Sequence, residues 1–549
     1  MAADQPGNWS AAAVGLDDLL GRFAPTVRDL LQLSNEPETD CDVPHASERA
    51  KTLGANQRKA MNMATQYPLE DSRKAEEAQI EIRGLVERAR AAQAQIRNLG
   101  QEDVRRIAAA IGWLAVTRAE VWGETVLAET GMGRVVSKVN RTRDRARGLM
   151  RDYQTAKTVG VIETDPEKGL VKIAKPVGVV AALIPTTVPE GVVFMGAMNA
   201  IMGRNAMICS PHPRAKFSTN FVVNDIRELL GRMDVPRDLV LCIEKPSLYK
   251  TGELMRHSDL VVATGGAPMV KAAYSSGTPA FGVGAGNAVV VIDETADVYY
   301  AADQIAHSQM NDFAIGCSTE NAIVVHDSVY DEMLKAIDQT KGYRCSAEEK
   351  KLLQRTLWVD GHLNPEVLSK PASFMAEKSG FTIPEDRDWL VVEETGYGPA
   401  YPFSGEKLSV VVAMYRFRRF EEAIDLVNNI HAYSGAGHSC GIYTADEDRI
   451  RKYAESTHTV RVAVGQATTR SNAGGWTTGM PFTINLGCGT WGGNIASENI
   501  TWRHYINTTW VARPIEPKVP SDSELFGSVL DETELFKNLP GVGQPEVES

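Results

Sequence analysis

The chain has 549 residues, of which 43% are hydrophobic and 23% are charged, and its formal net charge is -12. This length allows two or three domains with a sizeable buried core. The acidic balance argues against a nucleic-acid partner, because phosphate binding depends on a dense basic surface. No apolar run approaches the ~20 residues that span a bilayer, and the first residues lack the pattern of a secretion signal. We therefore expect a cytoplasmic protein with neither nucleic acid nor membrane as a partner.

The cysteines give no sign of a disulfide framework. They are scattered, odd in number and never arranged as Cys-x-x-Cys: Cys41, Cys209, Cys242, Cys317, Cys345, Cys440 and Cys488. This usage argues against a structural zinc site and favours a reducing compartment such as the cytosol. We expect no metal, and the pattern leaves room for a single reactive cysteine.

Residues 1–70 differ from the rest of the chain in composition and in the spacing of their apolar residues. Apolar residues recur at roughly helical spacing over residues 16–33, which indicates a short amphipathic helix. The polar, acidic stretch 34–48 is typical of a linker. Three roles stay open for this extension: an arm that packs on a neighbouring subunit, a docking helix for a larger assembly, or a tail without function. Residues 516–549 are predicted to form a C-terminal tail.

Two long helices are predicted next. Residues 73–97 are rich in Ala, Glu, Arg and Gln, which are strong helix formers. A second helix is predicted to start near Gln101, where Glu102 and Asp103 suit the positive end of a helix dipole. Gly131 is expected to end it.

Strand-like and helix-like segments then alternate, which is the pattern of parallel β-α-β units. Apolar strands are predicted at 177–184, 206–209, 239–243, 259–263 and 288–292, with helices between them such as 216–231 and 247–257. A second alternating block runs from about residue 320 to 465. The fold class is therefore α/β, with two related lobes and a cleft between them. Ligands are expected beyond the carboxyl ends of the strands.

Two glycine-rich segments are candidate cofactor contacts. The strand 259–263 leads into Thr264-Gly265-Gly266 and then a helix. Glycines let the backbone approach a ligand and free helix N–H groups bind phosphate, although a plain tight turn explains the segment equally well. The segment 282–287 resembles a dinucleotide fingerprint, but a β-rich stretch follows it instead of a helix. It is therefore not expected to form a usual Rossmann loop. We expect it to form a narrow wall of a binding site beside a flat ring of the ligand, where any side chain would collide.

Cys317 is the candidate nucleophile, in a loop after the predicted helix 297–311 and before the predicted strand 321–325. Backbone N–H groups in such a loop can lower a thiol pKa and hold an oxyanion. The alternative is a small buried hydrophobic residue, which is the commoner fate of a cysteine. His438 lies in a glycine-flanked loop suited to an active site, although most loop histidines face solvent. Glu406 would by itself be taken for a surface charge.

Several short segments carry these signals in one order along residues 75–515. They are 182–187, 210–216, 263–266, 282–287, 316–317, 406–409, 437–439 and 486–494. Taken together, they resemble the aldehyde dehydrogenase superfamily in its CoA-acylating branch. That branch includes the aldehyde dehydrogenase half of bifunctional aldehyde-alcohol dehydrogenases and the acylating sulfoacetaldehyde dehydrogenases. Each segment is weak alone, and the ordered set is highly specific.

The resemblance implies an aldehyde dehydrogenase fold with a definite division of the chain. A Rossmann-like cofactor-binding lobe is expected at 71–285, and a catalytic lobe that carries the nucleophilic cysteine at 286–468. Residues 469–515 are expected to return to the cofactor lobe and to include an oligomerisation strand near 502–511. Family members commonly form dimers or larger oligomers, so a homodimer or higher homo-oligomer is expected.

The resemblance also implies roles for single residues. Cys317 is the nucleophile, Thr187 stands where hydrolytic relatives place an oxyanion-hole asparagine, and His438 matches the histidine assigned a role in acyl transfer. Cofactor contacts are expected at Leu183, Ile184, Pro185, Thr186, Gly266, Gly284, Glu406, Ser409 and Gly487, next to Thr264 and Gly265 of the glycine turn.

Cofactor choice leans to NADP over NAD. The strand that ends at Ser210 is expected near the adenosine ribose. No acid follows it closely to bind a 2′-hydroxyl, whereas Arg214 and Lys216 are placed to meet a 2′-phosphate.

The window 282–286 contains no acid, whereas hydrolytic relatives carry a glutamate there that activates water. Without a general base at the thioester, a thiol nucleophile competes with water. The expected function is therefore reversible conversion of a short aldehyde (acetaldehyde or sulfoacetaldehyde), CoA and NAD(P)+ to acyl-CoA and NAD(P)H through an acyl-cysteine thioester. The alternatives are a hydrolytic aldehyde dehydrogenase that makes a free acid, and a non-catalytic assembly subunit that kept the fold.

Overall fold

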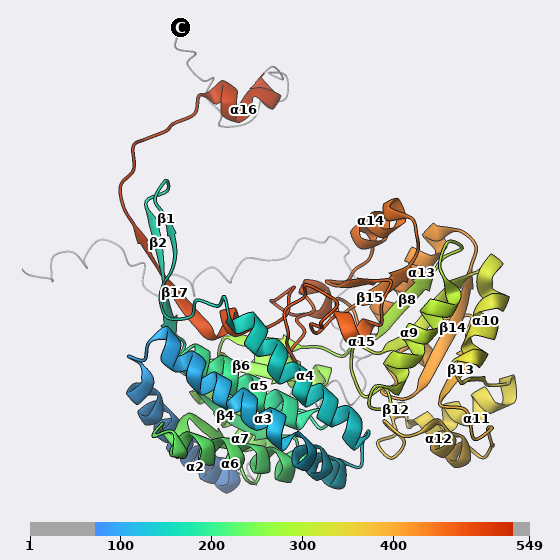
Figure 1. Cartoon of the computed structure of the whole chain (residues 1–549), viewed down its shortest axis with the longest axis horizontal. Coiled ribbons are helices and arrows are strands. Elements are labelled where there is room, and N and C mark those ends of the chain that lie inside the picture. Colours follow the sequence, from blue (N-terminus) through green and yellow to red (C-terminus); the bar gives the residue numbers. More distant parts are fainter. Residues whose placement is uncertain (1–71, 531–549) are drawn as a thin grey trace, which may run out of the picture. The chain divides into compact units, whose positions relative to one another are not determined.

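The computed structural model of the protein describes residues 72–530 (Figure 1). They all belong to one compact unit, which begins at Ala64. The predicted amphipathic segment 16–33, the linker 34–48 and Cys41 lie outside the described residues. The predicted C-terminal tail is described as far as residue 530, and it contains a short helix, α16 (Asp522–Leu530), that the sequence reasoning did not anticipate.

The first lobe is built on a five-stranded parallel sheet. Its strand order is β5-β4-β3-β6-β7. The strands are β3 (Val179–Ile184), β4 (Ala206–Pro211), β5 (Val240–Cys242), β6 (Leu260–Thr264) and β7 (Ala280–Val283). Every residue of β3 and β4 is buried, as expected for parallel strands covered on both faces. The predicted parallel α/β arrangement of this region is confirmed.

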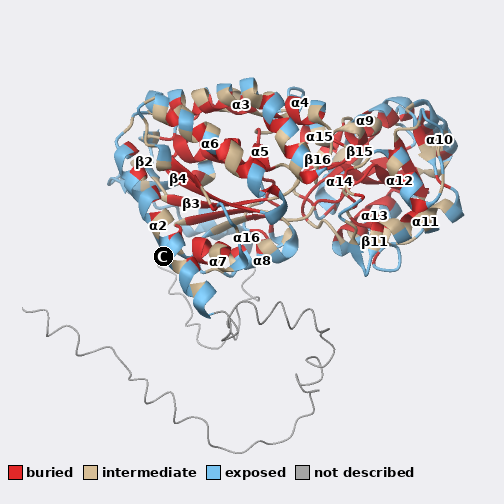
Figure 2. Ribbon diagram, turned by 90° about the horizontal axis from the view of Figure 1, so that it is seen from below, coloured by how far each residue is buried: buried red, intermediate tan, exposed pale blue. Residues whose placement is uncertain are grey.

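Helices cover both faces of this sheet. Figure 2 shows α3 and α4 over α5 and α6 on one face, with α2 and α7 on the other. The helices are α2 (Ser72–Ile96), α3 (Gln101–Thr130), α4 (Val135–Tyr153), α5 (Pro189–Met202), α6 (Lys216–Arg232), α7 (Leu248–His257) and α8 (Ala267–Tyr274). The predicted limits of α3 are confirmed: Glu102 and Asp103 lie in its first turn, and Gly131 ends it in the left-handed region at φ 66°.

The second lobe contains a seven-stranded parallel sheet with the order β10-β13-β14-β9-β8-β15-β16. Its strands are β8 (Ala288–Ile292), β9 (Glu320–His326), β10 (Gly342–Arg344), β13 (Trp389–Glu393), β14 (Val411–Phe417), β15 (Cys440–Tyr443) and β16 (Val462–Val464). The helices of this lobe are α9 (Val298–Met310), α10 (Tyr330–Gln339), α11 (Ala347–Leu357), α12 (Ala372–Ser379), α13 (Phe420–Tyr433) and α14 (Glu447–Ser456). Each lobe has its own hydrophobic core.

A small antiparallel sheet stands apart from the two parallel ones. Its order is β1 (Gly160–Asp165), β2 (Leu170–Pro176) and β17 (Ile506–Ala512). The predicted terminal strand is confirmed from Ile506 onward, after a 3-10 turn at Trp502–Tyr505. β17 lies at an edge, and among the described residues its outer side has no partner strand. Pairing of this edge across a subunit interface stays a prediction.

The remaining elements are short. β11 (Trp358–Val359) and β12 (His362–Leu363) form a hairpin, and α15 (Thr468–Ser471) follows β16. Within residues 72–530, no helix combines the length and the apolar character that crossing a membrane requires. The same residues contain no cluster of three or more His, Cys, Asp or Glu side chains able to hold a metal ion.

Trp122 on α3 offers a test of the first core. Its side chain is fully buried, and its indole N–H donates to Asp225 on α6 at 2.7 Å. Replacing it with alanine leaves a cavity and removes one of the donors to Asp225, which keeps its hydrogen bonds from Arg118, so we expect a loss of about 4 kcal/mol of unfolding free energy. Denaturant unfolding measures this loss. Trp113 on the same helix is 66% exposed, and Trp113→Ala should cost less than about 0.5 kcal/mol; equal losses would contradict the packing described.

Candidate active site

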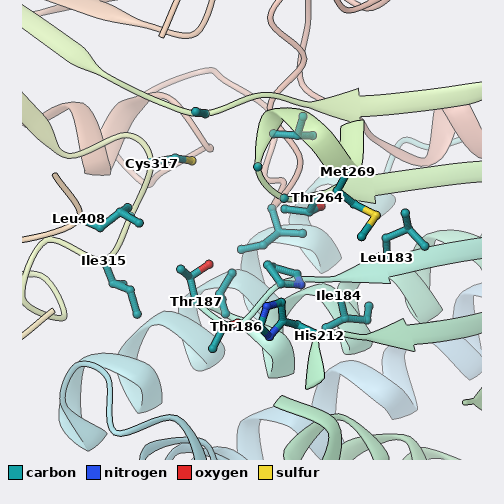
Figure 3. A pocket seen from close by; sticks show the side chains of 18 of the residues that line it. Leu183, Ile184, Thr186, Thr187, His212, Thr264, Met269, Ile315, Cys317 and Leu408 are labelled. Carbon is teal, nitrogen blue, oxygen red and sulfur yellow. The ribbon is translucent and has the colours of Figure 1, made fainter. Parts of the chain in front are cut away.

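A cavity of about 530 Å³ lies at the carboxyl ends of β3, β4 and β6 and reaches the loop before β9. Figure 3 shows two sides of it, with Cys317, Ile315 and Leu408 on one and Leu183, Ile184 and Met269 on the other. The carboxyl edge of a parallel sheet is where α/β proteins bind ligands. The cavity is therefore the candidate active site.

Most of the predicted site residues line this cavity. Cys317 and Thr187 do so, together with Leu183, Ile184, Pro185, Thr186, Ser210, Arg214, Thr264, Gly265, Gly266, Gly284 and Glu406. Three predicted residues do not line it: His438, Ser409 and Gly487. The structure brings most of the predicted site residues together around one cavity. The role assigned to each residue stays a prediction.

The nucleophile loop has an unusual backbone. Cys317 follows α9 and precedes β9, as predicted. Three successive residues before it, Asp312, Phe313 and Ala314, lie in the left-handed region at φ 58°, 52° and 58°. Residues other than glycine adopt this conformation at a cost, and they keep it where the surroundings impose it. Contacts with residues outside the turn must therefore stabilise this backbone conformation.

A buried cluster of charges holds this turn. The Asp312 carboxylate accepts hydrogen bonds from Lys138 at 3.0 Å, Arg141 at 2.8 Å and the backbone N–H of Arg134 at 2.5 Å. Arg141 also donates to Glu190 at 2.8 Å. The side chains of Lys138, Asp312 and Glu190 are fully buried. The donors outweigh the effect of burial, so the pKa of Asp312 lies below its ordinary value.

Burial dominates the chemistry of the Cys317 thiol. It raises the pKa of Cys317 to about 12, and the nearby carboxyl of Glu406 adds to the effect. The opposing influences, a hydrogen bond with Ser318 and the charge of Arg461, are smaller. The expectation that this loop lowers the thiol pKa is therefore wrong, because the loop lies against the apolar side chains of Val283, Ala473 and Leu486.

Glu406 is not a surface charge, because its side chain faces the cavity. The carboxylate accepts a hydrogen bond from the backbone N–H of Gly286 at 3.1 Å. Burial raises the pKa of Glu406 to about 8. The carboxyl therefore holds its proton to a higher pH than an exposed glutamate does. Among the described residues, it is the one acid that lines the cavity.

The glycine-rich window 282–287 forms a wall of the cavity, and β8 follows it directly as predicted. A Cβ on Gly286 would lie 1.8 Å from the carbonyl oxygen of Cys317, so no side chain fits there. Asn287 donates to the carbonyls of Ser404 and Ser434 at 2.8 Å and 3.0 Å. The window thus ties the loops that carry Glu406 and His438 to the start of β8.

His438 is packed beside the cavity. It is fully buried and its Nδ1 lies 2.8 Å from the hydroxyl of Ser439, while its Nε2 has no partner among the described residues. Burial and the charge of Arg461 lower the pKa of His438 to about 3, so the ring is neutral at physiological pH. A Cβ on Gly437 would lie 1.8 Å from the carbonyl oxygen of Cys488, so this loop needs glycine for close contact.

The sequence reasoning missed several residues of the site. Those that line the cavity include Arg141 and Arg145 of α4, His212, Asn311, Ile315, Leu408 and Thr469. A signal was present for the two arginines. They are four residues apart and share a helix face with the buried Lys138, Thr142 and Leu149. Cations that repeat on the buried face of a helix need an anion or a polar site.

The fold and the cavity are those of an α/β enzyme of the dehydrogenase class. The chain belongs to the aldehyde dehydrogenase family, whose sequence model matches residues 52–348. A sulfoacetaldehyde dehydrogenase of Acholeplasma sp is 40% identical over 464 residues, which cover 83% of this chain and 96% of the relative. A succinate-semialdehyde dehydrogenase (acetylating) of Clostridium kluyveri is 35% identical, over 82% of this chain and 99% of the relative.

The solved structures agree with this placement. An acetylating aldehyde dehydrogenase from Geobacillus thermoglucosidasius has a TM-score of 0.78 and 35% sequence identity, and the match covers 81% of this chain and 99% of that one. The predicted fold class is confirmed.

The thiol pKa yields a test by alkylation. Because burial raises the pKa of Cys317 to about 12, the thiolate fraction should grow across the whole accessible pH range. We expect the rate of iodoacetamide modification to rise about tenfold per pH unit between about pH 7 and about pH 10. Mass spectrometry of the peptide that contains Cys317 measures this rate. A plateau with a midpoint below about pH 8 would show a thiolate stabilised by its surroundings.

Asp312→Ala tests the charge cluster. The substitution leaves Lys138 and Arg141 buried with Glu190 as their remaining acid, so we expect a loss of about 3 kcal/mol in unfolding free energy. Denaturant unfolding gives the measurement. The control is Asp331→Ala, which removes an exposed ion pair with Arg416 at 3.4 Å and should cost less than about 0.5 kcal/mol. Similar values for both variants would mean that Asp312 does not hold the turn.

Proposed function

We propose that the protein is a CoA-acylating, NAD(P)-dependent aldehyde dehydrogenase for a short aldehyde such as acetaldehyde or sulfoacetaldehyde. One observation carries the proposal: Cys317 lines the cavity, while the cavity-lining residues of the glycine-rich window are Val283, Gly284 and Ala285. None of these three side chains can activate water. Glu406, the one acid among the described residues that lines the cavity, is assigned to the cofactor, and its carboxylate accepts a hydrogen bond from the backbone N–H of Gly286.

The relatives support acyl transfer to CoA rather than hydrolysis. A 39% identical relative from Bilophila wadsworthia, which the match covers over 97% of its length, is named sulfoacetaldehyde dehydrogenase (acylating). The relative from Clostridium kluyveri and the structure from Geobacillus thermoglucosidasius are both named acetylating. Hydrolysis to a free acid is thereby the weaker alternative.

The cavity fits a dinucleotide. Gly265 and Gly266 precede α8, and a Cβ on either would meet only the side chains of Met269 or Pro268, at 3.6 Å or more. This leaves open space for a ligand at the helix N-terminus. Ser210 and Arg214 line the same cavity beyond β4, in positions suited to an adenosine ribose and a 2′-phosphate. Arg214 therefore favours NADP over NAD.

The chain's own residues supply the rest of the chemistry. The Cys317 thiolate attacks the aldehyde carbon, and the oxyanion lies near the backbone N–H of Cys317, which donates to no acceptor among the described residues. Thr187 offers a hydroxyl from the same cavity. NAD(P)+, when bound, supplies the hydride acceptor. CoA then attacks the acyl carbon as a thiolate and Cys317 leaves as a thiolate, a balanced exchange that also runs in reverse.

His438 can assist CoA as a neutral ring, provided that the loop moves to bring its unpartnered Nε2 toward the cavity. The open edge of β17 favours a homodimer or higher homo-oligomer, in which this strand pairs with a second copy. We also propose a cytoplasmic location, with residues 1–70 as the segment that docks to any larger assembly.

CoA dependence tests the proposal. NAD(P)H formation from acetaldehyde and from sulfoacetaldehyde should require CoA, and Cys317→Ala should lower the rate by about 1000-fold or more. Cys242→Ala is the matched control, because Cys242 is half-buried at the end of β5 and does not line the cavity. Equal rates with and without CoA would establish a hydrolytic enzyme. No turnover with any aldehyde would favour the assembly subunit.

A further inference from the structure

The cations of the cavity differ in how their charge is balanced. Three arginines line it: Arg141, Arg145 and Arg214. Arg214 follows β4 at the end of the cavity assigned to the adenosine of the cofactor. Arg141 and Arg145 come from α4, on the side of the nucleophile loop, since Arg141 binds Asp312 of that loop.

Arg141 is neutralised, because it forms ion pairs with Asp312 and Glu190, each at 2.8 Å. Arg145 is not. Its guanidinium donates to the carbonyl oxygens of Ala473 and Gly474, the latter at 2.9 Å. Among residues 72–530, no carboxylate forms an ion pair with Arg145.

An aromatic ring lies near the Arg145 side chain. Its guanidinium lies 5.6 Å from the ring centre of Phe482. Burial and the charge of Arg141 lower the pKa of Arg145 to about 10, while Asp144 and a negative charge at Cys317 raise it. The side chain is therefore still cationic at neutral pH. Arg145 is half-buried, and a partly desolvated cation without a counter-ion is stabilised when a ligand supplies the missing negative charge.

We propose that Arg145 binds an anionic group of the aldehyde, so that the substrate is a short aldehyde carrying a carboxylate or a sulfonate. This inference rests on the proposed function of the same site. A planar guanidinium suits both oxyanions, because it can donate two parallel hydrogen bonds. In this proposal Arg145 determines which aldehydes bind, whereas Arg141 on the same helix stabilises the loop before Cys317.

The position of Arg145 on α4 links the anion site to the loop that carries Cys317. One turn of α4 separates Arg145 from Arg141, which holds the loop that leads to Cys317. The anion site and the nucleophile are therefore positioned by the same helix. An aldehyde bound at Arg145 presents its carbonyl carbon to Cys317 only if the connecting chain has the matching length.

Paired substrates test the proposal in the full-length protein. We compare kcat/KM for sulfoacetaldehyde and succinate semialdehyde with that for acetaldehyde and butanal, each with CoA. Arg145→Gln should lower kcat/KM for the preferred anionic aldehyde by about 10- to 100-fold and change the values for the neutral aldehydes by less than about threefold. Arg145→Lys should recover part of the loss. The two anionic arms show which combination of chain length and oxyanion the site prefers.

The matched control is Arg147→Gln, which removes the same charge from the exposed side of α4 and should alter none of these values. An equal loss for neutral and anionic aldehydes in Arg145→Gln would overturn the proposal, since it would assign Arg145 a purely structural role. A wild-type enzyme that prefers the neutral aldehydes would also overturn it.

A second readout separates this inference from the proposed function. Ethanesulfonate should slow the alkylation of Cys317 by iodoacetamide in the wild type and in Arg147→Gln, but not in Arg145→Gln. This measurement needs neither CoA nor turnover. Protection without CoA-dependent activity would retain the anion site and reject the reaction. Activity on anionic aldehydes that is indifferent to Arg145→Gln would retain the reaction and reject the anion site.

Discussion

The buried carboxylate of Asp312 is the interaction on which the site depends. It lies in a left-handed turn that non-glycine residues adopt only under constraint, and two cations and a backbone N–H of α4 and its N-terminal end bind it. This contact fixes the start of the loop that ends at Cys317. Because α4 packs against α3 and α5 of the first lobe, the loop that carries Cys317 is positioned by a helix of the first lobe.

The cationic side chains of α4 have two different roles: some stabilise the loop before Cys317, and one is free to bind a ligand. Lys138 and Arg141 form ion pairs with Asp312 and Glu190. Arg145, in contrast, carries a positive charge that no carboxylate among the described residues balances. Burial opposes the thiolate form of Cys317, so the thiol is poorly reactive at neutral pH.

The sequence was sufficient for most elements of the five-stranded sheet and its helices and for the place of Cys317 in its loop. Gly131 ended the second helix because a left-handed cap favours glycine, and Cys317 fell between α9 and β9 because both flanking elements had clear periodicity. The reasoning failed where distant segments decide the outcome. Arg145 meets Ala473 and Gly474, which lie more than 300 residues further along the chain, so its spacing on α4 indicates a cation on the buried face but does not show which distant segments it meets. The thiol pKa was misjudged for a related reason, because burial by remote side chains outweighs the local loop.

The central claim is that an acyl group rests on Cys317 until CoA removes it. The most direct measurement is the intact mass of the full-length protein after incubation with aldehyde and NADP+ in the absence of CoA. We predict a mass increase of one acyl group, located on the peptide that contains Cys317, and its release as acyl-CoA when CoA is added. An adduct that decays to free acid at the same rate without CoA, or no adduct at Cys317 during turnover, would contradict the mechanism.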